Sequence, residues 1–184
     1  MFIKKKNYYL YVDSTKSINL NLIKKNQKIC IIYRNLSGKE SFERVVKFKK
    51  ACQKKKFKFY VANNFNLAKQ IRADGLYLSA YNKKIYHFNN IIGSAHNYNE
   101  INQKIKQKCK TIILSRLFKT SYKNKKSFYG ITKFNLLSMN HSVNLVPLGG
   151  IKVSNLMKLN LVRSEGLALF SEIKKKPVIA NRLF

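Results

Sequence analysis

Short apolar segments recur along the whole chain and are separated by polar or helically patterned stretches. The segment 29–33, ICIIY, is apolar at every position, which is typical of a parallel strand buried on both faces. Similar segments of three to five residues predict further strands at 8–12, 57–61, 76–78, 91–93, 111–114, 145–148 and 166–170.

Apolar residues at helical spacing occupy most of the intervals between these segments. They predict a brief helix at 18–25, a long basic helix at 39–56, a short one through Leu67 and Ile71, and others at 98–109, at 131–137 and after 150. Asn97 followed by Glu100 is a plausible capping pair for the helix that begins near 98. We therefore count eight alternations of strand and helix, a rhythm that indicates an α/β fold with a parallel sheet.

The length of 184 residues fits a single domain spanning 1–184. Eight strand–helix units predict a (β/α)₈ TIM barrel, a fold that usually takes about 200 residues or more. We therefore expect a compact barrel with shortened helices. The tail after Glu172 is short and basic, which predicts a truncated last helix.

A glycine pair lies between two of the predicted strands, within the stretch 144–171. Gly149 and Gly150 follow an apolar strand and precede a helix. Since glycine has no Cβ, the backbone can turn there and come close to a ligand. In parallel β/α barrels the loops after the last two strands are the usual place for a phosphate. This stretch therefore predicts a phosphate-binding loop.

The chain carries 38 Lys and Arg residues against 7 Asp and Glu, a formal charge of +31. Such a charge is typical of nucleic-acid partners. However, only six of the basic residues are Arg, the residue that leads in base-edge and bidentate phosphate contacts, and the lysines are scattered. We therefore favour a general lysine-rich composition over a nucleic-acid role.

The cysteines and the lengths of the apolar runs indicate the cellular compartment in which the protein is expected. The cysteines, Cys30, Cys52 and Cys109, lie inside apolar patterns without a CxxC spacing, which favours reduced, buried thiols. No apolar run approaches the ~18 residues of a membrane span. The segment 8–12 is too short for the core of a signal peptide. We expect a cytoplasmic protein.

If the strands close into a barrel, function is expected at their carboxyl ends. His96 could transfer protons there, although from the residues alone a framework histidine held by hydrogen bonds is slightly favoured. No predicted strand exit carries a carboxylate, which argues against a paired-carboxylate mechanism and a dedicated Mg²⁺ cage. The residues expected at this rim suit a phosphorylated ligand: Arg34, Asn63, Asn64, Ser79, Asn82, Ser94, His96, Thr120, Lys123, Gly149, Gly150 and Ser171.

Several of these residues stand in motifs that, taken in order, resemble the thiamine phosphate synthase and thiazole tautomerase superfamily. The resemblance covers roughly residues 8 to 173. Its motifs are 73–75 (ADG), 93–96 (GSAH), 118–120 (FKT) with Lys123, 149–151 (GGI) and 166–171 (GLALFS). It implies a (β/α)₈ barrel and a transferase that joins hydroxymethylpyrimidine pyrophosphate to thiazole phosphate, releasing pyrophosphate.

The resemblance also implies roles for individual residues. Arg34, Ser94 and Lys123 would bind the pyrophosphate, and Lys123, His96 and Arg34 would take part in catalysis. The thiazole phosphate would be bound by Gly149, Gly150, Phe170 and Ser171, with Thr120 nearby. Cations at the pyrophosphate would stabilise the departing charge.

The sequence departs from the family pattern at the pyrophosphate end. The family's acidic Mg²⁺ ligands correspond here to Asn63 and Asn82, so any Mg²⁺ would arrive with the substrate. A family glutamine and lysine correspond to Ile32 and Leu36. The tautomerase branch needs no metal and uses a histidine at the position of His96. A tautomerase-like enzyme or a thiazole phosphate binder is therefore an alternative to the synthase, and a basic nucleic-acid-binding protein is a third possibility.

Overall fold

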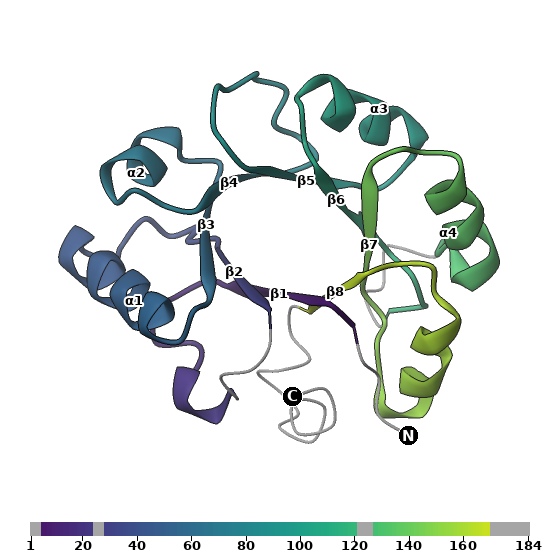
Figure 1. Ribbon diagram of the computed structural model, residues 1–184, viewed down its shortest axis with the longest axis horizontal. Helices are drawn as coiled ribbons and strands as arrows, with labels where there is room; N and C mark the ends of the chain where they lie inside the picture. Colours follow the sequence, from purple (N-terminus) through teal and green to yellow (C-terminus); the bar gives the residue numbers. More distant parts are fainter. Residues whose placement is uncertain (1–4, 24–27, 121–126, 170–184) are drawn as a thin grey trace.

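The computed structural model describes residues 5–23, 28–120 and 127–169, and it contains a closed barrel of eight parallel strands in the order β1 to β8. The strands form a ring and the helices lie outside it (Figure 1). The predicted (β/α)₈ barrel with short helices is confirmed. The strands are β1 Asn7–Val12, β2 Ile29–Tyr33, β3 Lys58–Ala62, β4 Gly75–Leu78, β5 Ile91–Ala95, β6 Thr111–Ser115, β7 Asn144–Leu148 and β8 Gly166–Leu169.

The helical elements follow the predicted order. α1 and α3 are shorter than predicted, α4 is longer, and two elements are 3₁₀ segments. They are η1 Leu20–Leu22, α1 Phe42–Lys54, α2 Phe65–Gln70, α3 Tyr98–Lys106, α4 Gly130–Met139 and η2 Val153–Leu161. The expected helix at 18–25 is represented by the single 3₁₀ turn η1, and the helix expected after the glycine pair is the 3₁₀ segment η2.

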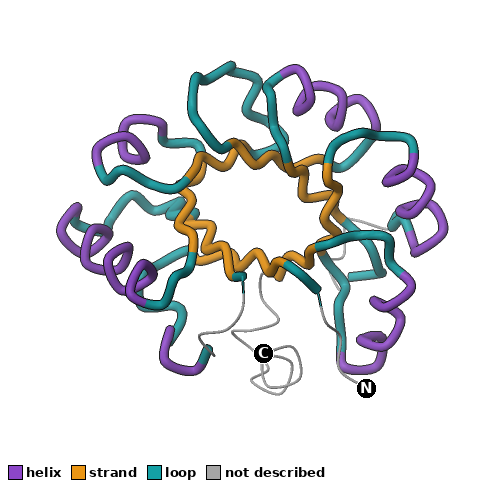
Figure 2. Tube along the Cα trace, viewed as in Figure 1, coloured by secondary structure: helices purple, strands orange, loops and turns teal. Residues whose placement is uncertain are grey.

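One of the eight expected alternations is wrong. Residues 79–90, which connect β4 to β5 and are described throughout, contain no helix (Figure 2). The connection instead crosses the outside of the barrel as an extended loop. Phe65 of α2 stacks on Tyr86 of this loop, with ring centroids 5.4 Å apart.

Side chains alternate between the inside and the outside of the barrel, as the period of two in strands requires. Ile29, Ile31 and Tyr33 of β2 belong to the outer core, between the sheet and the helices. Cys30 and Ile32 belong to a second cluster, which fills the interior. The whole strand is therefore buried, as its continuous apolar pattern predicted.

The interior of the barrel holds tyrosines as well as aliphatic side chains. Tyr9, Tyr11, Tyr60 and Tyr77 all belong to the inner cluster, where each is 5% exposed or less. The Tyr11 hydroxyl donates to the Tyr77 hydroxyl over 3.0 Å, and the two rings meet edge to face. These side chains help fill the barrel interior. Tyr9 and Tyr60 lie toward its amino end, next to Gly166 and Gly75, whereas Tyr11 and Tyr77 lie nearer the carboxyl-end rim.

The cysteines agree with the prediction of reduced, buried thiols. Cys30, Cys52 and Cys109 are all buried and free. In the described part of the chain, no helix has the length and apolarity that crossing a bilayer requires. The expected truncated last helix belongs to residues outside the described ranges.

Candidate active site

All eight strands are parallel, so their carboxyl ends form one rim, and the loops that follow β1 to β7 meet there. The rim is the candidate active site. Three of the residues assigned to it from the sequence, Lys123, Phe170 and Ser171, lie outside the described residues. The others can be placed.

The glycine pair is pressed against the loop after β6. Gly149 and Gly150 have φ of +96° and +72°, and an added Cβ on Gly150 would lie 2.3 Å from the carbonyl oxygen of Phe118. Phe118 N–H donates to the Gly149 oxygen at 3.1 Å. Glycine is therefore required here by the approach of another backbone as well as by the turn.

This approach brings the segment with Thr120 beside the glycine pair. The Oγ1 atom of Thr120 is buried and has no hydrogen-bond partner among the described residues. A buried hydroxyl without a partner is costly. The structure thus brings Gly149 and Gly150 next to the loop that carries Thr120. The Thr120 hydroxyl is available there to form a hydrogen bond with a ligand oxygen.

Arg34 and Ser94 are both assigned to the pyrophosphate. They meet inside the barrel at Tyr11 and Tyr77, hereafter the tyrosine pair. Ser94 lies within β5 rather than at its exit, because the strand continues to Ala95. Its hydroxyl bonds to that of Tyr77. Arg34 follows β2, and its Nε is buried with no hydrogen-bond partner in the described part of the chain.

Electrostatics support this placement. Burial raises the pKa of Tyr77, while hydrogen bonds from Ser94 and Tyr11 and the charge of Arg34 oppose the rise. Burial also raises the pKa of Tyr11, and Arg34 again acts in the opposite direction. Both phenols are therefore neutral at pH 7, and Arg34 is close enough for both to sense its charge. Arg34, Ser94 and the tyrosine pair form a donor-rich cluster beneath the rim.

The sequence does not identify Tyr11 and Tyr77 as residues of the site. The alternation of Tyr9 and Tyr11 in β1 is a signal that both face one side, but it does not tell which side is the interior. Ile32, where the family has a glutamine, lies fully buried in the same interior cluster, and Leu36 is 79% exposed.

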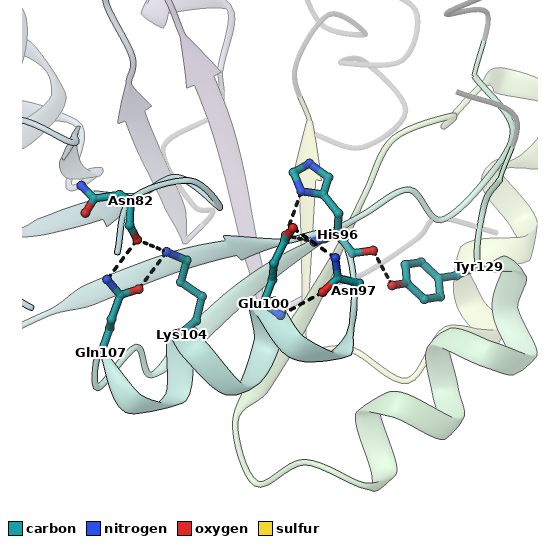
Figure 3. Close-up of polar contacts among 7 residues, drawn as sticks. All are labelled: Asn82, His96, Asn97, Glu100, Lys104, Gln107 and Tyr129. Atoms are coloured by element: carbon teal, nitrogen blue, oxygen red, sulfur yellow. Dashed lines mark hydrogen bonds and ion pairs between the residues drawn. The ribbon is translucent and has the colours of Figure 1, made fainter. Parts of the chain in front are cut away.

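His96 is held by a carboxylate. Its Nδ1 lies 2.9 Å from Glu100 Oε2, and its main-chain N–H donates to the same oxygen at 2.7 Å (Figure 3). Tyr129 from the start of α4 donates to the His96 carbonyl at 2.6 Å. Asn97 caps α3 and receives the N–H of Glu100, so the predicted capping pair is confirmed. With Nδ1 bonded to the carboxylate, Nε2 is left as the ring nitrogen that can exchange a proton.

The expectation that no carboxylate lies at a strand exit is therefore wrong, because two carboxylates reach the exits from residues outside the strands. Glu100 reaches the exit of β5 from the first turn of α3. Glu40 reaches the exits of β1 and β2, where it accepts from Tyr33 Oη at 2.6 Å and from Thr15 N–H at 2.9 Å. Burial raises the pKa of Glu40, but hydrogen bonds from Tyr33, Thr15 and Ser14 outweigh it, so the pKa is lowered overall.

The two asparagines at the family's metal positions bond to each other. Asn63 Oδ1 accepts from Ser79 N–H at 3.0 Å and from Asn82 Nδ2 at 3.2 Å. Asn82 Oδ1 accepts from Lys84 N–H at 3.0 Å. The amide oxygens are the only groups of these side chains that could bind Mg²⁺. Both are neutral and turned toward main-chain donors, and that of Asn63 already accepts two hydrogen bonds.

No cluster of three or more His, Cys, Asp or Glu residues suited to a metal ion occurs among the described residues. The residues present at this part of the rim therefore do not fit a magnesium ion held by the protein.

The closed parallel barrel, with a left-handed glycine turn after β7, has the fold of the (β/α)₈ enzymes and a loop at the position where that class commonly binds phosphate. Within that class, residues 13–173 match the model of the thiamine monophosphate synthase family. The chain belongs to this family, which places it among the transferases of thiamine biosynthesis.

Individual relatives agree over nearly the whole chain. Thiamine-phosphate synthase of Pelagibacter ubique is 29% identical over 97% of this chain and 95% of the relative. Its counterpart in Flavobacterium johnsoniae is 26% identical, over 93% and 88%. Among solved structures, thiamine phosphate pyrophosphorylase from Pyrococcus furiosus superposes with a TM-score of 0.73 at 16% identity, covering 97% of this chain and 91% of that chain. This last likeness shows the fold.

Proposed function

We propose that the chain is a thiamine phosphate synthase, which joins hydroxymethylpyrimidine pyrophosphate to thiazole phosphate. The bond between the pyrimidine methylene carbon and the diphosphate oxygen breaks, and its electron pair leaves with pyrophosphate. The lone pair of the thiazole nitrogen then forms the new carbon–nitrogen bond, giving the thiazolium of thiamine phosphate. The observation that carries this proposal is the family match over residues 13–173.

The geometry of the rim is consistent with separate binding places for the two substrates. The buried Nε of Arg34, beside Ser94 and the tyrosine pair, can donate to the diphosphate as negative charge develops on it. The glycine pair and Thr120 can receive the thiazole phosphate. Lys123, by the family resemblance, is a further cation for the departing pyrophosphate.

The test is product formation by the purified full chain with both substrates. Thiamine phosphate is measured by chromatography and pyrophosphate by an enzyme-coupled assay, and reactions that lack either substrate serve as controls. We expect equal amounts of the two products. Lys123→Ala should reduce turnover by about 100-fold or more, the size typical for one transition-state donor. No thiamine phosphate from the wild-type chain would refute the proposal.

A second candidate, a thiazole tautomerase, is favoured by the contact between His96 and Glu100. The carboxylate orients the imidazole and would stabilise the imidazolium that forms during proton transfer. Conversion of the thiazole carboxylate phosphate isomer without the pyrimidine substrate would favour this activity. A nucleic-acid role for the +31 charge stays a prediction that we rank last. It would require binding whose affinity falls steeply with salt.

A further inference from the structure

Lys104 of α3 has a fully buried side chain although it is a lysine, and its exposed fraction is 0%. Its aliphatic part passes over Gly93 of β5, where an added Cβ would lie 2.8 Å from Lys104 Cδ. Burying an ammonium costs several kcal/mol unless hydrogen bonds compensate it. Two bonds do so: Nζ donates to the main-chain oxygen of Asn82 at 2.7 Å and to Gln107 Oε1 at 2.8 Å.

Gln107 completes the arrangement from one turn further along the chain. Its Nε2 donates to the main-chain oxygen of Asn82 at 3.0 Å (Figure 3). The same atom donates to the main-chain oxygen of Lys84 at 2.6 Å. Lys104 and Gln107, hereafter the Lys104–Gln107 clamp, therefore hold two carbonyls of the loop 79–90. This is the connection that lacks a helix, so the clamp supplies attachment that a packed helix would otherwise give.

The clamped loop carries Asn82, whose amide bonds to Asn63. Main-chain N–H groups of Ser79 and Lys84 fix both amide orientations, with the oxygens turned toward these donors. With the oxygens in this orientation, the pair presents mainly its remaining amide hydrogens to a ligand. Donors backed by a buried ammonium attract an anion and disfavour a cation.

We propose that Lys104 is a positioning residue that fixes the Asn63–Asn82 amide pair, and that this pair binds the diphosphate of the substrate directly, in place of a metal ion held by the protein. The proposal rests on the proposed function for the identity of the anion. It assigns a role to a side chain that lies outside the barrel interior, between α3 and β5, and acts through the main chain of Asn82.

The test measures the binding of inorganic pyrophosphate to the full chain by titration calorimetry, once with EDTA and once with Mg²⁺. The variants are Lys104→Met, which keeps the aliphatic length and removes the charge, and Gln107→Leu, which removes the second half of the clamp. Lys106→Met is the matched control, because Lys106 is exposed on the same helix. Thiazole phosphate is titrated in parallel.

We expect the wild-type chain to bind pyrophosphate in EDTA within about threefold of its affinity in Mg²⁺. Each clamp variant should weaken pyrophosphate about tenfold or more, while thiazole phosphate changes less than about twofold. The control should behave as wild type. If Lys104→Met does not fold, Gln107→Leu carries the test.

Three results would overturn the inference: pyrophosphate binding that requires Mg²⁺, clamp variants that bind pyrophosphate normally, and equal weakening of both ligands, which would mean a general structural role. Failure of the proposed function is separate, because it shows as absence of thiamine phosphate from the wild-type chain. A double variant, Asn63→Asp with Asn82→Asp, should make pyrophosphate binding depend on Mg²⁺ by restoring charged oxygen ligands.

Discussion

Replacing Gly150 by alanine should harm the protein more than the same change at Gly38, although both residues have left-handed backbones, with φ of +72° and +64°. A left-handed conformation costs an alanine roughly 1–2 kcal/mol at either position. At Gly38 nothing lies within 4 Å of the added Cβ. Gly38→Ala is therefore a matched control for the conformational cost alone.

At Gly150 the added Cβ would lie 2.3 Å from the oxygen and 2.5 Å from the carbon of the Phe118 carbonyl. These are main-chain atoms, which cannot move aside by changing a rotamer. Overpacking of this kind adds about 1–3 kcal/mol, so the total for Gly150→Ala is roughly 2–5 kcal/mol. For a chain of this size the corresponding fall in Tm is about 4–20 °C, against about 2–8 °C for Gly38→Ala.

The assay is thermal and urea unfolding of both variants, followed by titration with thiazole phosphate. Since relief of the clash must move the loop that carries Thr120, we expect Gly150→Ala to weaken thiazole phosphate by about tenfold or more, and Gly38→Ala to leave it unchanged. Equal destabilisation by the two substitutions, with unchanged ligand affinity in both, would refute the close approach of the two loops.

Three other changes have expected outcomes. His96→Ala and Glu100→Gln should spare condensation and reduce any tautomerisation, by about 100-fold for the histidine and less for the glutamate, measured with each substrate set; equal loss of both activities would argue against separate roles. Glu40→Gln should lower the free energy of unfolding at pH 7 by about 1 kcal/mol, because hydrogen bonds to a charged acceptor are weakened. Since the folded-state pKa of Glu40 lies below its usual 4.5, its contribution is fully present above pH 4.5 and is lost as the pH falls through the lowered pKa. Urea unfolding should therefore separate wild type from variant more widely at pH 7 than at pH 3. Finally, burial raises the pKa of Cys30 and Cys52 to about 12 and of Cys109 to about 11, so a thiol reagent at pH 8 should label the chain only after denaturation, and rapid labelling of the folded protein would contradict the described burial.

The sequence predicted the strands well because burial leaves a local trace. The run at 29–33 is apolar throughout, and the structure buries every one of its residues. The connection at 79–90 was harder, because what holds it there is non-local. Its attachment depends on Lys104 and Gln107, which lie about 20 residues away and read as ordinary polar positions of a helix.

The rim shows the same division between local and non-local information. The left-handed turn at Gly149 and Gly150 was visible as a residue pair. The carboxylates at the rim were not, because Glu40 and Glu100 belong to loop and helix positions that fold back over the strand ends. Ser94 was expected at a strand exit, because the predicted strand ends at residue 93. β5 continues to Ala95, since serine and alanine are also compatible with a buried strand.

The tyrosine pair inside the barrel gives the protein a built-in optical signal. The chain contains no tryptophan, so its near-ultraviolet absorption and emission arise from tyrosine and phenylalanine alone. Tyr11 and Tyr77 are buried, are joined through their hydroxyls and lie within the influence of the charge of Arg34. An anion that neutralises this guanidinium should therefore change the tyrosine spectrum, and occupancy of the pyrophosphate end can be followed without a label.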